Sequence, residues 1–293
     1  MAAEPDPAAD SIYLLAQRFS YAYATPVRHL RHRLVVVPRA VHGHQRRLSH
    51  RVTVSGSPAL VSVSADGFGN HVVEVRAAEV TAGIEFESWA VVGRDGPGGE
   101  TTLPPAAIGD ARLLGPTALT RTDTRLADAA RELAAGGAGG LGLAERACSW
   151  AHAALAYEYG VTGVRTAAAD ALAGGRGVCQ DYAHVMLAVC RCAGLPARYV
   201  SGHLVGEGGS HAWVEVVVAD PSRPGRAVAV AFDPTHDRRA GRGYLTVAVG
   251  RDYADVAPTS GTFEGDGPGV LSGRKRLSVV GAGEPGPVVL AAT

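Results

Sequence analysis

Cys179 lies in a sequence context that favours a reactive thiolate. It follows the glycine-rich stretch Gly174-Gly-Arg-Gly177, and the residues after it fit a helix that ends at Gly194. Cys179 is therefore expected in the first turn of a helix, where unpaired backbone N–H groups carry partial positive charge. This charge favours a thiolate, and the same N–H groups can donate to an oxyanion on a carbonyl under attack. The alternative is a buried structural cysteine, the usual role of a free cysteine.

A cysteine nucleophile needs a base, and His211 is the candidate. The run His211-Ala-Trp-Val-Glu215 alternates like a strand, which predicts His211, Trp213 and Glu215 on one face that lines a cleft. Asp233 ends the next predicted strand, and in a hairpin with the first it could orient the imidazole of His211. Alone, each residue has an ordinary explanation, as a surface histidine or an Asp-Pro turn. Together they predict a catalytic triad.

The sequence does not indicate a metal or a cofactor. It contains no C-x-x-C pair and no His-x3-His pair, so no zinc site is expected. A metal-dependent hydrolase built on His184, His203 and His211 would also lack suitable ligand spacing. The remaining cysteines are expected to be structural thiols, not a disulfide framework: Cys148, Cys190 and Cys192.

The elements that would position these residues fall into two domains and predict an α+β fold. Residues 10–93 form short alternating strands with turns between them, typical of an antiparallel β-sandwich or barrel. Residues 94–115 are rich in glycine and proline and are interpreted as a linker. Residues 116–293 are expected to form the catalytic domain, with helices first, an antiparallel sheet after them and a C-terminal β tail.

Composition excludes several classes of protein. The formal net charge is zero, with 46% hydrophobic and 19% charged residues, so the chain is globular, and bulk charge indicates no nucleic-acid or membrane partner. No apolar run reaches the length of a membrane span, and Met1–Asp10 does not have the pattern of a signal peptide. The expected location is the cytoplasm.

Four motifs closely resemble the bacterial transglutaminase-like family, and the likeness extends over nearly the whole chain. The motifs are Gly177-Val-Cys-Gln-Asp-Tyr-Ala-His184, Gly194-Leu-Pro-Ala-Arg-Tyr-Val-Ser-Gly202, His211-Ala-Trp-Val-Glu215 and Phe232-Asp-Pro-Thr235. The resemblance implies a papain-like core without metal, in which Cys179 is the nucleophile, His211 the base and acid, and Asp233 the orienting carboxylate. The β-rich first domain is similar to the region that precedes such cores.

One departure concerns the residue after Asp-Pro-Thr, which is His236 here and often Asn in the family. Three further residues are candidates for oxyanion or substrate contacts: Gln180, Tyr159 and Trp213. The expected activity is cysteine-dependent acyl transfer on a peptide or protein amide, with hydrolysis of a peptide or isopeptide bond favoured. A transglutaminase that accepts an amine and an inactive binding module remain alternatives.

Overall fold

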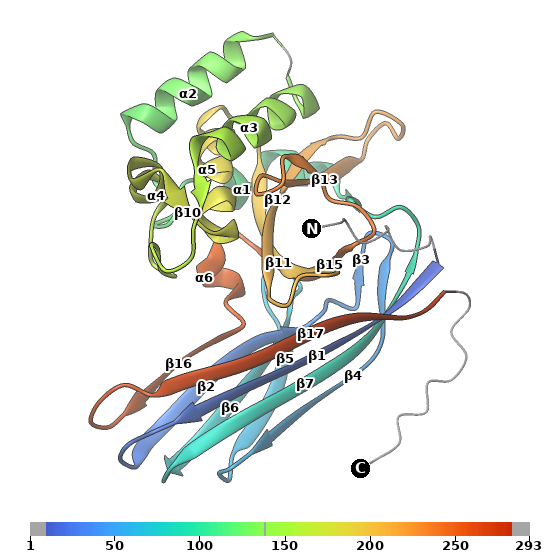
Figure 1. Cartoon of the computed structure of the whole chain (residues 1–293). Coiled ribbons are helices and arrows are strands. Elements are labelled where there is room, and N and C mark those ends of the chain that lie inside the picture. Colours follow the sequence, from blue (N-terminus) through green and yellow to red (C-terminus); the bar gives the residue numbers. More distant parts are fainter. Residues whose placement is uncertain (1–9, 138, 283–293) are drawn as a thin grey trace.

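The computed structural model describes residues 10–137 and 139–282 and consists of a β-sandwich below a mixed helical and β part (Figure 1). One sheet of the sandwich has the order β17-β1-β7-β4-β3 and the other β16-β2-β6-β5. Their strands are β1 (Asp10–Ala22), β2 (Val27–Val37), β3 (Val41–His42), β4 (Gln45–Ser55), β5 (Leu60–Ala65), β6 (His71–Val80), β7 (Gly83–Asp95), β16 (Thr259–Glu264) and β17 (Val270–Ala282).

The alternation expected in the first domain is visible in its core. Phe19, Leu34, Val75 and Phe86 are buried between the two sheets, while the intervening side chains face outward. Strands β5 and β6 form a hairpin, with Val63 opposite Val73. The α+β class and the β-rich first domain are thus confirmed.

The C-terminal β tail, predicted as part of the second domain, belongs to the sandwich of the first domain. β17 pairs with β1 along its length, and β16 pairs with β2, so both strands complete the sandwich instead of extending the catalytic domain. Figure 1 shows β17 beside β1, although the two lie at opposite ends of the sequence. Without β16 and β17, the edges of β1 and β2 would have unpaired backbone N–H and C=O groups. Local sequence patterns do not reveal that two C-terminal strands pair with these edges. Residues 283–293, which the prediction included in the second domain, lie outside the described residues.

The mixed helical and β part, here called the catalytic part because it carries the three residues of the predicted triad, contains a sheet of order β14-β13-β12-β11-β15, with helices on one face. The predicted linker is not structureless, because its strand β8 pairs with β13. The elements are β8 (Glu100–Leu103), η1 (Pro105–Gly109), α1 (Ala111–Leu114), α2 (Thr124–Ala135), α3 (Leu141–Ala154), β9 (Ala156–Tyr157), α4 (Ala168–Gly174), β10 (Arg176–Gly177), α5 (Cys179–Cys192), β11 (Ala197–Leu204), β12 (His211–Ala219), β13 (Ala227–Asp233), β14 (Arg238–Arg239), β15 (Tyr244–Gly250) and α6 (Tyr253–Val256).

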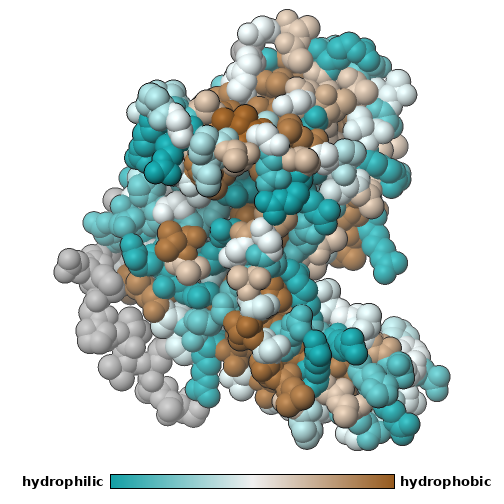
Figure 2. Space-filling model, turned by 180° about the vertical axis from the view of Figure 1, so that it is seen from behind, coloured by the Kyte–Doolittle hydropathy of each residue, from teal (hydrophilic) through white to brown (hydrophobic). Residues whose placement is uncertain are grey.

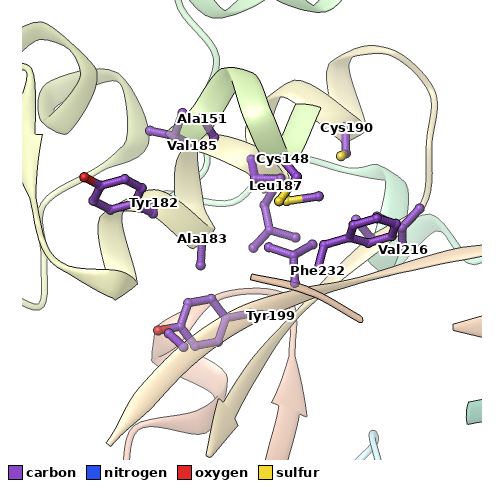
Figure 3. Close-up of a cluster of buried hydrophobic side chains, with 14 of the residues drawn as sticks. Cys148, Ala151, Tyr182, Ala183, Val185, Leu187, Cys190, Tyr199, Val216 and Phe232 are labelled. Atoms are coloured by element: carbon purple, nitrogen blue, oxygen red, sulfur yellow. The ribbon is translucent and has the colours of Figure 1, made fainter. Parts of the chain in front are cut away.

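Helix α5 is the centre of this part. Twelve of its 14 residues are buried, and it packs against α2, α3, α4 and the sheet. Figure 3 shows side chains of α5, including Leu187, meeting Cys148 of α3 and Phe232 of β13. Because close-packed cores resist displacement, the residue that begins α5 is held in a fixed position.

The sandwich projects as a lobe from the catalytic part when the molecule is seen from behind (Figure 2). Hydrophobic side chains are visible on both parts of this surface. None of the described helices is long and apolar enough to cross a membrane.

Candidate active site

Asp181 and two glycines fix the start of α5 and therefore the position of Cys179. The Asp181 carboxylate accepts hydrogen bonds from the backbone N–H of Val178 at 2.8 Å and from the Thr162 hydroxyl at 2.6 Å. Gly175 ends α4 with φ +65°, and a Cβ on Gly177 would lie 2.6 Å from the Asp181 carboxylate. The chain can therefore turn directly into α5, where the first backbone N–H groups lack helical partners and can donate to a ligand.

The structure brings Cys179, His211 and Asp233 together. Nε2 of His211 lies 2.8 Å from Oδ2 of Asp233, and His211 and Cys179 line the same cleft. Burial lowers the pKa of His211, but the interactions with Asp233 and Cys179 outweigh it and raise this pKa to about 10. The imidazole is therefore protonated at neutral pH and can stabilise a thiolate beside it.

Asp233 is surrounded by hydrogen-bond donors. Oδ2 accepts from the Tyr244 hydroxyl at 2.7 Å and lies 2.7 Å from Nδ1 of His236, while Oδ1 accepts from the backbone N–H of Thr235. Burial acts to raise the pKa of Asp233, but the bonds from His211, His236 and Tyr244 hold it well below its usual range. Asp233 is thus a fixed anion that orients His211.

Glu207 forms a second link between the two histidines. Its carboxylate oxygens lie 3.3 Å from Nδ1 of His211 and 3.4 Å from Nε2 of His236. His236 therefore contacts the triad carboxylate and Glu207, and it does not line the cleft at Cys179. Ligand atoms of His211, Asp233 and His236 lie within 4.8 Å of one another, so a metal ion could bind there only by replacing the triad's hydrogen bonds.

A cleft of about 670 Å³ opens above Cys179, and both parts of the molecule line it. The catalytic part contributes the start of α5, the Gly208–Ser210 loop and the segment after α3. The sandwich contributes Phe19 of β1 and Leu271, Gly273 and Lys275 of β17. The sandwich thus forms one wall of the candidate active site.

The additional predicted contact residues lie in different places. Gln180 and Tyr159 line the cleft, where Gln180 Nε2 donates to the Gly163 carbonyl and Tyr159 is 79% exposed. Trp213 is 1% exposed and does not line the cleft, contrary to the expectation from alternation. Its ring stacks against that of His211. Trp213 is buried because both faces of this strand are covered by other parts of the protein.

Glu215 is also buried instead of lining the cleft. One oxygen lies 2.6 Å from Nε2 of His42, and the other accepts from Arg198 at 2.7 Å. The sequence alone reveals neither this cluster nor the positions of Glu207, Tyr244 and Lys275 beside the predicted triad. Sequence patterns do not show that β3 and β17 of the sandwich reach the catalytic sheet.

Two family models match the two parts of the chain. Residues 127–227 match the transglutaminase-like superfamily core, and residues 13–93 match the bacterial transglutaminase-like N-terminal region. The uncharacterized protein Rv2569c of Mycobacterium tuberculosis is 33% identical over 281 residues, which cover 85% of this chain and 86% of that protein. The chain belongs to the transglutaminase-like superfamily.

Two further similarities show the extent of this relationship. The uncharacterized protein ML0607 of Mycobacterium leprae is 40% identical over 165 residues, so the match spans about half of each chain, 53% and 56%. A candidate cysteine protease from Cytophaga hutchinsonii has a TM-score of 0.75 at 19% identity, with 95% of this chain and 93% of that chain covered. The latter likeness shows that the two proteins share the fold, sandwich included.

Proposed function

We propose that the protein is a cysteine-dependent acyl-transfer enzyme that hydrolyses a peptide or isopeptide amide through a thioester at Cys179. The observation that carries this proposal is the position of His211, which is hydrogen-bonded to Asp233 and lines the same cleft as Cys179. Membership of the transglutaminase-like superfamily supports the same chemistry. An inactive binding module would not require this buried, charged arrangement.

In the first half-reaction, the Cys179 sulfur attacks the amide carbon and a C–S bond forms. The carbonyl oxygen becomes an oxyanion, which backbone N–H groups at the start of α5 stabilise. The C–N bond then breaks as the proton of His211 passes to the departing nitrogen, and the amine leaves. In the second half-reaction His211 removes a proton from the acceptor, which attacks the thioester and releases Cys179.

Access to the cleft supports water as the acceptor. Cys179 is half-buried, and the cleft of about 670 Å³ above it lets water reach the sulfur. An acceptor amine would complete the same steps and form a new amide. The two outcomes therefore differ in the second half-reaction alone.

The first experiment measures the rate of Cys179 alkylation by iodoacetamide between pH 5 and 9, with the modified residue identified by mass spectrometry. We expect alkylation to be fast at pH 6, and His211→Ala to reduce the rate there at least tenfold, because the imidazolium no longer stabilises the thiolate. His42→Gln is the matched control, since it removes another buried histidine. If Cys179 reacts no faster than the exposed Cys192, the enzyme proposal fails.

A second experiment identifies the acceptor. Fluorescently labelled casein is incubated with the protein in the presence and absence of a dansylated amine. Cleavage or deamidation without incorporation of the amine supports hydrolysis, whereas incorporation that requires Cys179 supports a transglutaminase. The Cys179→Ala protein provides the background for both.

A further inference from the structure

The cleft at Cys179 is lined by a single permanently charged side chain. Of the described residues that line it, Lys275 alone carries a charge, apart from the Cys179–His211 pair. Lys275 is also the only lysine in the sequence. The nearest carboxylate on the adjoining loop, Glu207, is directed to His211 and His236.

Lys275 is held at the cleft by β17 and its neighbours. Leu271, Gly273 and Lys275 alternate along this strand on the side that faces the cleft. The ammonium Nζ donates to the Ser210 hydroxyl at 3.0 Å and lies 5.4 Å from the centre of the Phe19 ring. These contacts direct the ammonium toward the side of the cleft where Ser210 precedes His211.

This ammonium has no counter-ion in the part of the chain that the structure describes. Every carboxylate oxygen of the described residues lies more than 4.0 Å from Nζ, and a lysine has three N–H donors, one of which Ser210 uses. Burial lowers the pKa of Lys275, while the interaction with Cys179 acts in the opposite direction. A partly buried cation without an anion is costly, and a ligand that supplies the anion regains this energy.

We propose that Lys275 binds a carboxylate of the substrate, so that the preferred substrates are amides with a free carboxylate close to the bond that is cleaved. Peptides and isopeptides next to a free α-carboxylate belong to this class. The assignment rests on the proposed function, because it places the carboxylate in the cleft where Cys179 acts. It also gives the sandwich a direct role in substrate selection.

The test compares two alkylating probes of nearly equal shape, iodoacetate and iodoacetamide, which differ in the negative charge. Second-order rate constants for Cys179 are measured at pH 7 in a Cys192→Ser background. The imidazolium of His211 also favours the anionic probe, so the informative quantity is the change in the iodoacetate-to-iodoacetamide ratio between variants. We expect Lys275→Met to lower this ratio on the order of fivefold, as for a partly screened ion pair, with the iodoacetamide rate nearly unchanged.

Two controls separate recognition of the anion from other effects. Lys275→Arg keeps the positive charge and is expected to keep most of the ratio. Arg276→Met removes a positive charge from the neighbouring position of β17, outside the cleft lining, and is expected to leave the ratio unchanged. The fivefold effect should also decrease in 1 M NaCl, because salt screens the interaction.

The outcomes distinguish this proposal from the proposed function. If Lys275→Met leaves the ratio unchanged, or lowers both rates equally, the cation does not select a carboxylate and the inference is wrong, although Cys179 is reactive. If Cys179 of the unmodified protein is inert toward iodoacetamide, the enzyme proposal fails first, and this inference fails with it.

Discussion

Two buried clusters on the catalytic sheet each combine a histidine with a carboxylate, and the pKa of the histidine is shifted in opposite directions in the two clusters. In the first, His211 and Asp233 adjoin Cys179; in the second, His42 contacts Glu215. The pKa of His211 is raised to about 10, whereas that of His42 is lowered. His211 and Glu215 lie four residues apart on β12. This one strand therefore contributes a residue to each pair, one with a protonated imidazole (His211) and one with a neutral imidazole (His42 of β3).

The difference follows from the third member of each cluster. Arg198 supplies a permanent cation to Glu215 and lowers the pKa of that buried carboxyl. Burial then lowers the pKa of His42, and the charges of Arg198 and Arg39 act in the same direction. No arginine pairs with Asp233 among the ion pairs of the described residues, and its compensating cation is the imidazolium. A histidine beside a carboxylate is therefore protonated where no other cation neutralises that carboxylate.

Replacing Asp233 by Asn should produce the largest change. Without the carboxylate, His211 loses both its orientation and the charge that keeps it protonated. Turnover in the casein assay is expected to fall about 10³–10⁴-fold, as for the loss of the carboxylate in other triads. Glu215→Gln is the control, and its turnover per folded molecule should stay within about threefold. An equal loss in both variants would mean that the two clusters are not functionally distinct.

Replacing Arg198 by Met tests the second cluster. The change leaves Glu215 buried with its main cation removed, and the free energy of unfolding in urea is expected to fall by about 3–5 kcal/mol. Adding Glu215→Gln to this variant should restore part of the loss, because the uncompensated charge is then absent. Unchanged stability of Arg198→Met would show that the buried ion pair between Arg198 and Glu215 does not stabilise the fold.

The two histidines predict opposite effects of pH on stability. The folded protein keeps the proton of His211 up to about pH 10, whereas an unfolded histidine loses it near pH 6.5. The stability that this proton gives to the folded state is therefore fully present below pH 6.5 and is lost as the pH rises through 10. His42 stays neutral when folded, so its contribution is present above 6.5 and is lost as the pH falls. Urea unfolding at pH 5, 7 and 9.5 should show that Asp233→Asn flattens the alkaline decline and His42→Gln the acid one. Parallel pH curves for the three proteins would contradict the assignment.

The smallest expected effect concerns His236. Zn²⁺ should inhibit Cys179-dependent turnover by binding His211, Asp233 and His236, and EDTA should restore activity. His236→Asn should weaken this inhibition about tenfold while changing metal-free turnover by only about twofold, since an amide can still donate to Asp233. Equal zinc sensitivity in both proteins would place the inhibitory ion elsewhere, for example on the Cys179 sulfur.

The local arrangement of the site could be predicted from sequence, whereas its surroundings could not. The glycine-rich turn before Cys179 and the strands that carry His211 and Asp233 are visible in residue spacing. The structure pairs His211 with Asp233 and places His211 and Cys179 in the same cleft. The burial of Trp213 and the neighbours of Glu215 depend on what covers the sheet. The position of Lys275 depends on a strand pairing between Gln17 and Lys275, across almost the whole described chain.

The pairing of β17 with β1 has a consequence for synthesis of the chain. The ribosome completes β17 after all other described elements, so Cys179, His211 and Asp233 emerge before the strand that carries Lys275. Until then the edges of β1 and β2 lack their final partners and can pair with other chains. A nascent chain in which β17 is not yet made therefore holds Cys179 without this wall of its cleft, and the proposed selectivity of Lys275 is acquired only once β17 has paired with β1.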